Sequence, residues 1–535
     1  MEYYIINNAS RASHYGIGTY VQQLVNVLKS QNGINIYSVE LYADVNNFEV
    51  IESDDGVTHL QFPSCRSGME SESYCRSVCC LLSNYISRCE RHTIFHFNYF
   101  QHYPLALAVK SKFPQARIIL AVHYFGWCFS LKGNVTKFRE TIKDVKETSE
   151  NDKLRREYER EREFLCLADL VVALSEFAKN LIISDYKISS TKIRIVYNGL
   201  DNNSCKKNQY LLHKGYRRII LFVGRLDDIK GVPYLVKAFC KLATEYRDLQ
   251  LYVVGDGNYD SIFALCHEII GRVIFTGRLS KDDLCQLYDK TLFGVLPSFH
   301  EQCSYSAIEF MMKGIPFIGT DSTGLREMLS EMTQLIVHIN ETDFSEETFI
   351  QELAEKMEAM IKDSDFRQVA SYRLFDLYSS RYTIDEMSNG MLSIVEGIKE
   401  LPIVSDDFLT IIDKRMIDLI NSRPDVDLEF YGMTGIGVYL WWRVSSANTE
   451  DRSYLHTLED ALANYFGWLY DTVITYKEAI CCAELNGMLL SMSNIKRYAS
   501  MAHNILTSFS IVRDAIIPDD KETIFNALRI ITTKI

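Results

Sequence analysis

Short apolar runs alternate with segments of helical periodicity from residue 1 to about residue 398, and this alternation restricts the possible folds more than any other feature of the chain. In the first half we expect strands at Tyr3–Ile6, Ile34–Leu41, Val57–Phe62, Thr93–Phe97, Arg117–Val122, Leu170–Leu174 and Ile193–Tyr197. In the second half we expect them at Arg218–Val223, Leu249–Val254, Arg272–Thr276, Thr291–Leu296, Ile315–Ile318 and Gln334–Val337. Strands that are apolar on both faces and separated by helices are typical of parallel sheets covered on both sides. Two successive sets therefore predict two doubly wound, Rossmann-like α/β domains.

The chain has 535 residues, which is too many for one hydrophobic core, because single cores stop growing near about 250–300 residues. We expect an N-terminal domain at residues 1–203 and a second α/β domain at 204–398, whose last helices cross back to the first. An all-helical region is expected at 399–535. The polar stretch Asn202–Tyr216 has no periodicity and marks the boundary between the two α/β domains. Such domains bind ligands outside the carboxyl ends of their strands, so a central cleft between the two is the expected active site.

Composition and charge exclude several classes of protein. With 47% hydrophobic residues and only nine prolines, the chain is neither disordered nor fibrous. Its 57 Lys and Arg against 70 Asp and Glu give a net charge of −13, which disfavours a nucleic-acid partner. No apolar run reaches the roughly 18 residues needed to cross a bilayer, so membrane contact is expected to be peripheral at most.

The first residues and the cysteines bear on location. Met1–Asn7 lacks the basic region and the long apolar core of a secretion signal, and it is interpreted as a strand. The 14 cysteines are then most simply reduced thiols in a cytoplasmic protein. The tightest cysteine cluster, close to two histidines, comprises Cys75, Cys79, Cys80, Cys89, His92 and His96. It lacks a repeated Cys-x2-Cys spacing, so no metal is expected. The alternative is an amphipathic helix that buries Tyr74, Val78, Leu81 and Tyr85 with the cysteines.

Two charged stretches each allow two interpretations. Lys137–Glu163 contains nine basic and nine acidic side chains, which suits either a partner-binding arm or a solvated helix with i,i+4 ion pairs. Lys187–Arg218 contains eight basic residues against Asp201 alone. It could face an anionic membrane or acceptor, or it could be a solvated linker beside a phosphate-binding cleft.

The segment Leu296–Pro316 holds the strongest indication of a binding site. A strand ends at Leu296, a loop carries Glu301, and a helix is predicted from about Ser304 to Gly314. The backbone N–H groups of Ser304, Tyr305 and Ser306 then have no partner within the helix and could hold a diphosphate. Glu309 is one turn further on, where its carboxylate could accept from two ribose hydroxyls. The alternative is an ordinary strand–loop–helix unit with two surface glutamates.

A second strand-to-helix turn adds positive charge. Arg225 and Lys230 lie five residues apart between a strand that ends at Val223 and a helix opened by Pro233. Both can therefore reach the same point above the sheet edge, where two cations would neutralise the charge on a departing diphosphate. The alternative is surface ion pairing with Asp227 and Asp228.

These motifs resemble a known family. Gly224-Arg225-Leu-x-x-x-Lys230-Gly231, followed by Glu301-x7-Glu309-x4-Gly314-x-Pro316, is similar to the retaining glycosyltransferases of family four, which have the two-domain GT-B architecture. Further segments in the same order also match: Asn8–Tyr20, Val122-His123, Leu174–Phe177, Tyr197–Asp201, Gly255–Gly257 and Phe275–Arg278. The resemblance covers about residues 1–398.

The resemblance implies a role for each site residue. Arg225 and Lys230 would hold the donor diphosphate, Glu309 the ribose and Glu301 the sugar hydroxyls. His123 would contact the transferred sugar from the opposite domain, although it could also be a core histidine that caps a strand end. The resemblance also implies a donor-binding surface formed by Gly16, Gly18, Gly224, Gly255, Gly277, Arg278, Leu279, Ser304, Tyr305 and Ser306. Gly16 and Gly18 could instead serve only a tight strand–helix turn. The family generally needs no metal or other cofactor.

The implied reaction is transfer of a sugar from a nucleotide-sugar, expected to be UDP-linked, to a hydroxyl acceptor with retained anomeric configuration. The acceptor could belong to a glycan, a lipid, a peptide or a small molecule, and the oligomeric state stays open. A nucleotide-sugar epimerase of the same architecture and a catalytically silent scaffold are the alternatives. In the tail, Tyr431–Leu440 resembles the first helical repeat of lanthionine-cyclase-like proteins. The tail is therefore interpreted as an acceptor-recognition, peptide-binding or oligomerisation module.

Overall fold

The computed structural model describes residues 1–9, 15–64, 71–86, 93–113, 115–143, 149–201 and 218–398, together with residues 413, 417, 420, 421, 456–458, 460, 461, 464 and 465. The chain divides into two compact units, Met1–Ile403 and Val404–Ile535. All the described residues of the second unit are helical. The predicted boundary at Asn202–Tyr216 and the motif at Tyr431–Leu440 lie outside the described residues.

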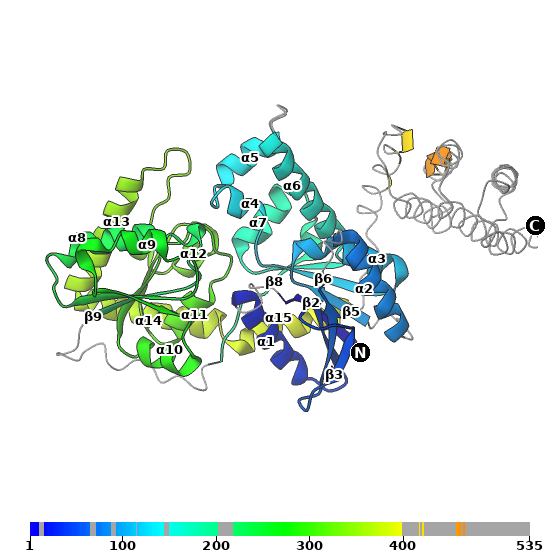
Figure 1. Ribbon diagram of the computed structural model, residues 1–535, viewed down its shortest axis with the longest axis horizontal. Coiled ribbons are helices and arrows are strands. Elements are labelled where there is room, and N and C mark those ends of the chain that lie inside the picture. Colours follow the sequence, from blue (N-terminus) through cyan, green and yellow to red (C-terminus); the bar gives the residue numbers. More distant parts are fainter. Residues whose placement is uncertain are drawn as a thin grey trace, which may run out of the picture. The chain divides into compact units, whose positions relative to one another are not determined.

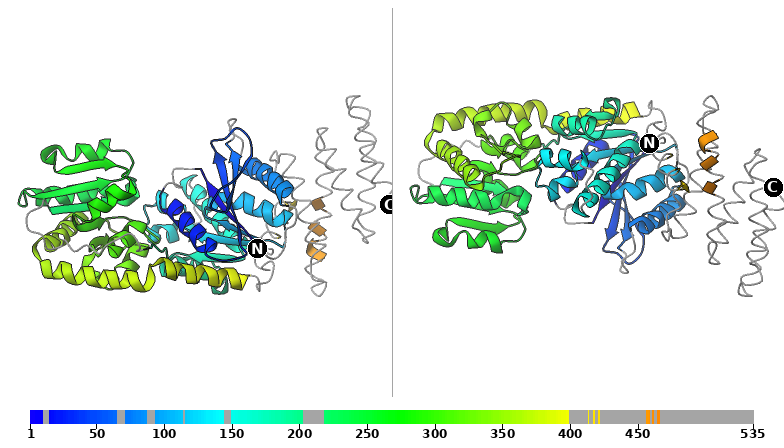
Figure 2. Two further views of the ribbon diagram at one scale, coloured as in Figure 1. Left: turned by 90° about the horizontal axis from the view of Figure 1, so that it is seen from below. Right: turned by 90° about the horizontal axis from the view of Figure 1, so that it is seen from above.

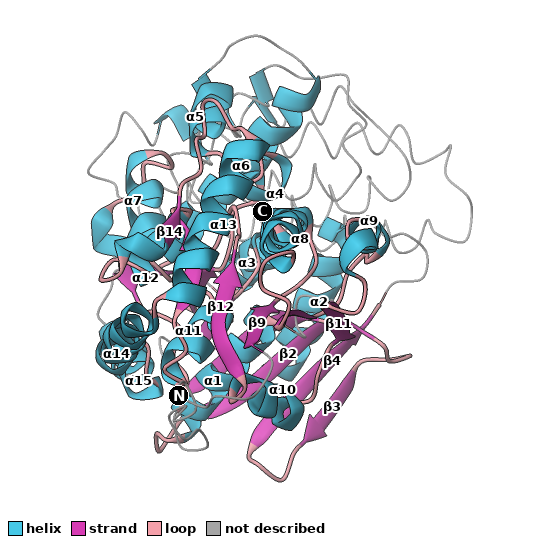
Figure 3. Cartoon of the chain, turned by 90° about the vertical axis from the view of Figure 1, so that its left-hand side faces the viewer, coloured by secondary structure: helices cyan, strands magenta, loops and turns pink. Residues whose placement is uncertain are grey.

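The first unit contains two sheets with helices on both faces (Figures 1 and 3). The first sheet has the order β3-β4-β2-β1-β5-β6-β7-β8. Its strands are β1 (Glu2–Asn8), β2 (Asn35–Ala43), β3 (Glu49–Glu52), β4 (Val57–Pro63), β5 (Thr93–Phe97), β6 (Arg117–Val122), β7 (Leu170–Ala173) and β8 (Ile193–Ile195). Its helices are α1 (Gly16–Lys29), α2 (Ser71–Tyr85), α3 (Tyr103–Lys112), α4 (Trp127–Ser130), α5 (Val135–Lys143), α6 (Ser149–Leu167) and α7 (Glu176–Ser184).

The second sheet has the order β11-β10-β9-β12-β13-β14, and its described strands are all parallel. They are β9 (Arg218–Val223), β10 (Leu249–Val254), β11 (Val273–Gly277), β12 (Thr291–Leu296), β13 (Phe317–Thr320) and β14 (Ile336–Val337). The helices are α8 (Val232–Ala243), α9 (Asp260–Ala264), α10 (Lys281–Tyr288), α11 (Tyr305–Met312), α12 (Thr323–Met328), α13 (Glu346–Lys362), α14 (Ser364–Arg381) and α15 (Ile384–Gly397). The prediction of two doubly wound domains is confirmed.

The strand order places a crevice at the carboxyl ends of particular strands. In the first sheet the order reverses between β1 and β5, and in the second between β9 and β12. The helices that follow such a pair of strands leave to opposite faces of the sheet, which opens a crevice between the two strand ends. The loops after β1, β5, β9 and β12 are therefore the expected ligand-binding loops.

The last helix of the first unit, α15, returns to the first sheet. Leu200 donates its N–H to Tyr382 O and accepts from the N–H of Ile384, at 3.1 and 3.0 Å. Further along α15, Met391 Sδ accepts a hydrogen bond from the Tyr20 hydroxyl of α1 at 3.9 Å. Figure 2 shows α15, in yellow, alongside α1. This helix therefore connects the second α/β half to the first.

Three local expectations were wrong. β3 was missed because its four residues, Glu49–Glu52, are all exposed, and it pairs antiparallel with β4 at the sheet edge.

In α2 the buried face comprises Tyr74, Cys75, Val78, Cys79 and Leu82, whereas Leu81, Tyr85 and Cys80 are exposed. The helix turns about 100° per residue, so the buried stripe passes from Cys79 to Leu82 rather than to Leu81.

The charged stretch Lys137–Glu163 is also different from the single solvated helix that was one of its two interpretations. It forms parts of α5 and α6, and Phe138, Leu154 and Glu161 are buried. Two ion pairs within α6 are spaced i,i+3, one between Asp152 and Arg155 and one between Glu159 and Arg162. The aromatic ring of Phe138 stacks on Trp127 at 4.5 Å, which explains why this segment is packed rather than solvated.

Candidate functional site

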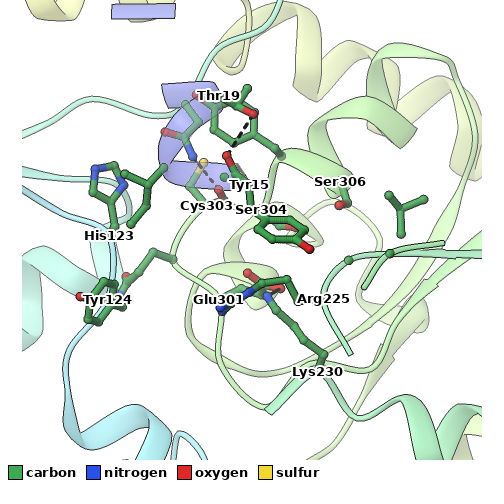
Figure 4. Close-up of a pocket in the computed structure, with 18 of the residues that line it drawn as sticks. Tyr15, Thr19, His123, Tyr124, Arg225, Lys230, Glu301, Cys303, Ser304 and Ser306 are labelled. Atoms are coloured by element: carbon green, nitrogen blue, oxygen red, sulfur yellow. Dashed lines mark hydrogen bonds and ion pairs between the residues drawn. The ribbon is translucent and has the colours of Figure 1, made fainter. Parts of the chain in front are cut away.

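A cavity of about 880 Å³ lies at the carboxyl ends of the strands and takes residues from both halves of the first unit. This volume is in the range of ligand pockets, about 300–1,000 Å³. Most of the residues predicted for the site line it: Gly16, His123, Gly224, Arg225, Lys230, Gly255, Arg278, Leu279, Glu301, Ser304, Tyr305, Ser306 and Glu309. Segments nearly 300 residues apart in the sequence thus meet around one space (Figure 4).

The two predicted cations come from the turn after β9. Lys230 ends a 3-10 helix, Asp228–Lys230, and Gly231 follows with φ +67° before α8 begins. A Cβ atom at Gly231 would lie 2.2 Å from Pro297 O, so only glycine fits there, and the turn is held close to the loop after β12. Figure 4 shows the Arg225 and Lys230 side chains directed toward the same part of the cavity, beside Glu301.

Each cation has a carboxylate partner. Lys230 Nζ lies 2.5 Å from Glu301 Oε1, and the Arg225 guanidinium lies 3.1 Å from Asp227 Oδ2. The alternative of ion pairing with Asp227 therefore holds for Arg225, whereas Lys230 pairs with Glu301 across the cavity wall. The Lys230 and Arg225 side chains keep 17% and 27% of their surface exposed. Both cations can therefore contact a ligand in the cavity.

The N-terminus of α11 supplies the third positive element. Ser304 is its N-cap, and its hydroxyl oxygen accepts from Ala307 N at 3.5 Å. The first backbone N–H groups of an α-helix have no partner within the helix and carry the positive end of its dipole. Ser304, Tyr305 and Ser306 line the cavity, so this end of the helix borders the same space as Arg225 and Lys230.

The two glutamates occupy different surroundings. Glu301 accepts from Ser298 Oγ at 3.0 Å as well as from Lys230. Glu309, one turn into α11, accepts from the Tyr288 hydroxyl at 2.6 Å, and burial raises the pKa of its carboxyl group above the ordinary value. Glu309 therefore has one oxygen held by Tyr288 and borders the cavity, where hydroxyl donors of a ligand could reach it.

The opposite wall comes from the first sheet. His123 follows β6, and its Nε2 lies 3.1 Å from Asn98 Oδ1. Burial lowers the pKa of His123 to about 3, so the imidazole is neutral. Next to it, Tyr124 donates to Gln101 Oε1 at 2.8 Å and contacts Phe129 edge to face at 5.4 Å. This wall offers polar groups and aromatic rings to a ligand that enters opposite the cations.

Two predicted residues do not line the cavity. Gly18 lies inside the first turn of α1, between the lining residues Ile17 and Thr19. Gly277 ends β11 with φ +67°, immediately before the lining residues Arg278 and Leu279.

Gly255, which lines the cavity, must be glycine, because its φ is +137° and an added Cβ would lie 1.8 Å from Gly224 O.

Comparison with known families agrees with this geometry. Residues 15–204 match a model described as Glycosyltransferase Family 4, and residues 217–363 match one described as Glycosyl transferases group 1. The first match contains every strand of the first sheet except β1, the second contains the whole second sheet, and together they contain both walls of the cavity. The chain belongs to the family 4 glycosyltransferases. Its fold is accordingly the GT-B fold, with two Rossmann-like domains around a cleft.

Relatives and solved structures extend the comparison of this family 4 chain. An uncharacterized glycosyltransferase of Methanocaldococcus jannaschii is 26% identical over 246 residues, which cover 43% of this chain and 60% of that protein. In three of the curated relatives that it matches, including this one, the matched region spans 30–60% of the relative's length. The structure of sucrose-phosphate synthase from Thermosynechococcus elongatus has a TM-score of 0.60 at 18% identity, covering 74% of this chain and 98% of the other. That of Anabaena HepE in complex with UDP and glucose has a TM-score of 0.54 at 16% identity, covering 74% and 99%.

Tyr15 was not predicted as a site residue, yet it lines the same cavity. Its hydroxyl donates to Asp256 Oδ2 at 2.5 Å, and Arg225 and Arg278 lie 6.0 and 5.6 Å from the centre of its ring. This aromatic ring therefore connects the loop after β1 to the second sheet. Tyr15 directly precedes Gly16, yet nothing in the local sequence shows that it contacts a residue 241 positions away.

Two further features concern metal ions and membranes. Within the described part of the chain, no three His, Cys, Asp or Glu side chains are arranged to hold a metal ion. Cys89 and His92 lie outside the described residues, and His96 is buried, with its Nδ1 2.7 Å from the Tyr3 hydroxyl. None of the helices in the described ranges has both the length and the apolar character that a bilayer crossing requires.

A buried carboxyl group beside the cavity predicts a pH effect on stability. Glu161 accepts from Gly126 N at 2.6 Å and from the Tyr186 hydroxyl, and burial raises its pKa from 4.5 to about 7. A raised pKa means that the folded state holds the proton more tightly, so this stabilisation is complete below pH 4.5 and is lost as the pH rises through 7. Relative to the unaltered protein, Glu161→Gln should therefore gain about 3 kcal/mol of unfolding free energy between pH 4.5 and pH 8.

Urea denaturation at a series of pH values measures this difference. The matched control is Glu159→Gln on the same helix, where the exposed carboxylate pairs with Arg162. Its effect on the unfolding free energy should stay within about 1 kcal/mol, as for other surface ion pairs. A Glu161→Gln variant whose stability follows that of the unaltered protein at every pH would show that Glu161 ionises normally.

Proposed function

We propose that the chain transfers a sugar from a nucleotide-sugar, UDP-linked, to a hydroxyl acceptor with retention of the anomeric configuration. The observation that carries this proposal is the arrangement of Arg225, Lys230 and the N-terminus of α11 around one cavity, with Glu309 one turn into the helix. Two cations and a helix N-terminus suit a diphosphate. A carboxylate one turn further along suits the ribose that is attached to it.

The donor would lie along the second sheet. Its diphosphate would contact Arg225, Lys230 and the amides of α11, and the ribose hydroxyls would donate to Glu309. The nucleobase would then pass the loop of Arg278 and Leu279, which lines the cavity after β11. The transferred sugar would face the first sheet, between Glu301 on one side and His123 on the other.

The positive groups of the protein around the diphosphate would promote the reaction. As the bond from the sugar to the diphosphate breaks, negative charge builds on the leaving oxygen, and Arg225, Lys230 and the helix N-terminus stabilise it. These groups are already in position, so little reorganisation is needed during the reaction. Glu301 accepts hydrogen bonds from Lys230 and Ser298, which favours a role in holding the ammonium group and the sugar over one as a nucleophile.

The acceptor would approach from the first sheet. Gln101, Tyr124, Phe129 and Glu157 line that side of the cavity and combine hydrogen-bonding groups, aromatic rings and a carboxylate. This lining suits a polyhydroxylated acceptor such as a glycan or a glycosylated small molecule. Attack on the face from which the diphosphate leaves would retain the configuration, and the leaving oxygen could take the acceptor proton.

The structure of Anabaena HepE with UDP and glucose supports a UDP-linked donor, because its fold aligns with 74% of this chain. The relatives reported above give no support to the epimerase alternative. Intact Arg225, Lys230, Glu301 and Glu309 around the cavity argue against a silent scaffold.

A thermal-shift series with UDP, GDP, UDP-glucose and UDP-N-acetylglucosamine tests the proposal. UDP and at least one UDP-sugar should raise the melting temperature, because a ligand that binds only the folded state stabilises it by mass action. The same UDP-sugar should then be hydrolysed slowly without an acceptor. When an acceptor is added, UDP should be released faster because the sugar is transferred to the acceptor. Binding without hydrolysis or transfer would support the scaffold, and a change in the sugar stereochemistry without an acceptor would support the epimerase.

A further inference from the structure

Asn98 lies directly behind His123 on the first sheet. It follows β5 at its carboxyl end and is 1% exposed, and it is not part of the cavity lining. Its side chain makes two hydrogen bonds, one to the backbone of β1 and one to the imidazole of His123. Asn98 therefore connects a cavity residue to the central strands of the sheet.

The backbone of β1 decides which way the Asn98 amide faces. Asn98 Nδ2 lies 3.1 Å from Ile6 O. A carbonyl oxygen can only accept a hydrogen bond, so the amide nitrogen must be the group that faces it. The Asn98 Oδ1 then faces His123 Nε2 at 3.1 Å, and an amide oxygen can only accept.

This orientation fixes the protonation of the His123 ring. Since Asn98 Oδ1 accepts, His123 Nε2 must carry the hydrogen. Burial lowers the pKa of His123 to about 3, so near neutral pH the ring carries one proton, and Nδ1 keeps a free lone pair. Nδ1 is then the nitrogen left to bind a ligand, and it can only accept a hydrogen bond.

A second contact holds the ring from the side. Tyr20 of α1 meets His123 edge to face, with ring centres 4.6 Å apart. The Tyr20 hydroxyl lies 3.3 Å from His96 Nε2, and the Tyr3 hydroxyl lies 2.7 Å from His96 Nδ1. These side chains are buried, so His123 has little freedom to rotate away from Asn98.

We propose that Asn98 is a positioning residue, which holds His123 as the tautomer protonated at Nε2 so that Nδ1 accepts a hydrogen bond from a hydroxyl group of the transferred sugar. This inference rests on the proposed function, because the hydroxyl belongs to the sugar of the donor. A histidine held in the other tautomer would present an N–H to that hydroxyl instead. Asn98 thereby decides which hydrogen-bonding partner the cavity offers to the sugar.

Kinetics of single and double variants test whether Asn98 acts through His123. Asn98→Ala should lower kcat/KM for the UDP-sugar about tenfold and leave the Kd of UDP, which has no sugar, within twofold. His123→Ala should give a similar loss. The double variant should be no worse than His123→Ala alone, since interacting residues are not additive.

Two controls separate this role from a loss of structure. The first is Asn7→Ala on the neighbouring strand β1. Its Oδ1 has no hydrogen-bond partner among the described residues, and the variant should keep full activity. The second is a ¹⁵N spectrum of the His123 ring, which distinguishes the two neutral tautomers. The unaltered protein should show the hydrogen on Nε2, and Asn98→Ala should show a mixture.

Additive losses in the double variant, or a His123 hydrogen on Nδ1 in the unaltered protein, would overturn the inference. A protein that binds no UDP and transfers no sugar would overturn the proposed function and the ligand role of Nδ1 with it. In that case the ¹⁵N spectrum would still decide whether Asn98 sets the tautomer, so the two failures are distinguishable.

Discussion

Lys230→Ala should lower kcat/KM for sugar transfer by 10²- to 10³-fold, which is the largest effect that we expect from a single substitution. Removing one preorganised group that stabilises developing negative charge costs about this much in other enzymes. The substitution also removes the only cation that the described structure pairs with the Glu301 carboxylate, because Lys230 Nζ lies 2.5 Å from Glu301 Oε1. An uncompensated carboxylate beside the diphosphate adds repulsion to the loss of attraction. Initial rates at varied donor concentration measure the effect.

Lys237→Ala is the matched control for this prediction. Lys237 lies on α8, seven residues after Lys230 in the sequence, and its ammonium pairs with Glu346 outside the cavity lining. Exposed ion pairs of this kind contribute about 0–1 kcal/mol, so both activity and melting temperature should change little. If Lys230→Ala and Lys237→Ala had the same kcat/KM, the ammonium of Lys230 would have no role in the reaction.

Glu309→Ala should weaken UDP binding about 10- to 100-fold and raise the donor KM by a similar factor. A hydrogen bond to a charged group is worth about 1.5–3 kcal/mol, and the ribose offers two hydroxyl donors. Calorimetric titration with UDP measures the change. Glu358→Ala is the control, because Glu358 likewise accepts from a tyrosine hydroxyl, that of Tyr246 at 3.0 Å, but lies outside the cavity lining.

The ionisation of Glu309 adds a pH dependence to the same experiment. Burial raises the pKa of Glu309, so the carboxylate takes up a proton at a higher pH than an exposed glutamate does. The ribose hydroxyls donate best to the ionised form, so UDP affinity should fall as the pH drops through this raised pKa. Glu309→Gln should bind UDP weakly with a flatter pH profile. A UDP affinity that is equal in the unaltered protein and in Glu309→Ala would exclude Glu309 from ribose binding.

Much of the site was predictable because it depends on local rules. Helix stop and cap residues placed α11 between Ser304 and Gly314, and the structure has it at Tyr305–Met312 with Ser304 as its cap. The spacing of Arg225 and Lys230 across a strand-to-helix turn placed both cations at one sheet edge. Parallel strands end at the same edge, so these local predictions combine into one site without further information.

The rest depends on contacts between distant segments. Tyr15 bonds Asp256, Tyr288 bonds Glu309, and Asn98 bonds His123, and none of these pairs has a sequence signal. The edge strand β3 was missed for a different reason. Its residues are exposed on both faces, so they show neither the apolar run nor the alternation by which strands are recognised.

A crystal structure of the chain with UDP tests the central claim most directly. We predict that diphosphate oxygens lie about 2.7–3.2 Å from the side-chain nitrogens of Arg225 and Lys230 and from backbone amides at Ser304–Ser306. The ribose hydroxyls should lie at the same distance from Glu309. UDP bound elsewhere on the chain, or a diphosphate in this cavity that contacts neither cation nor the helix N-terminus, would contradict the account.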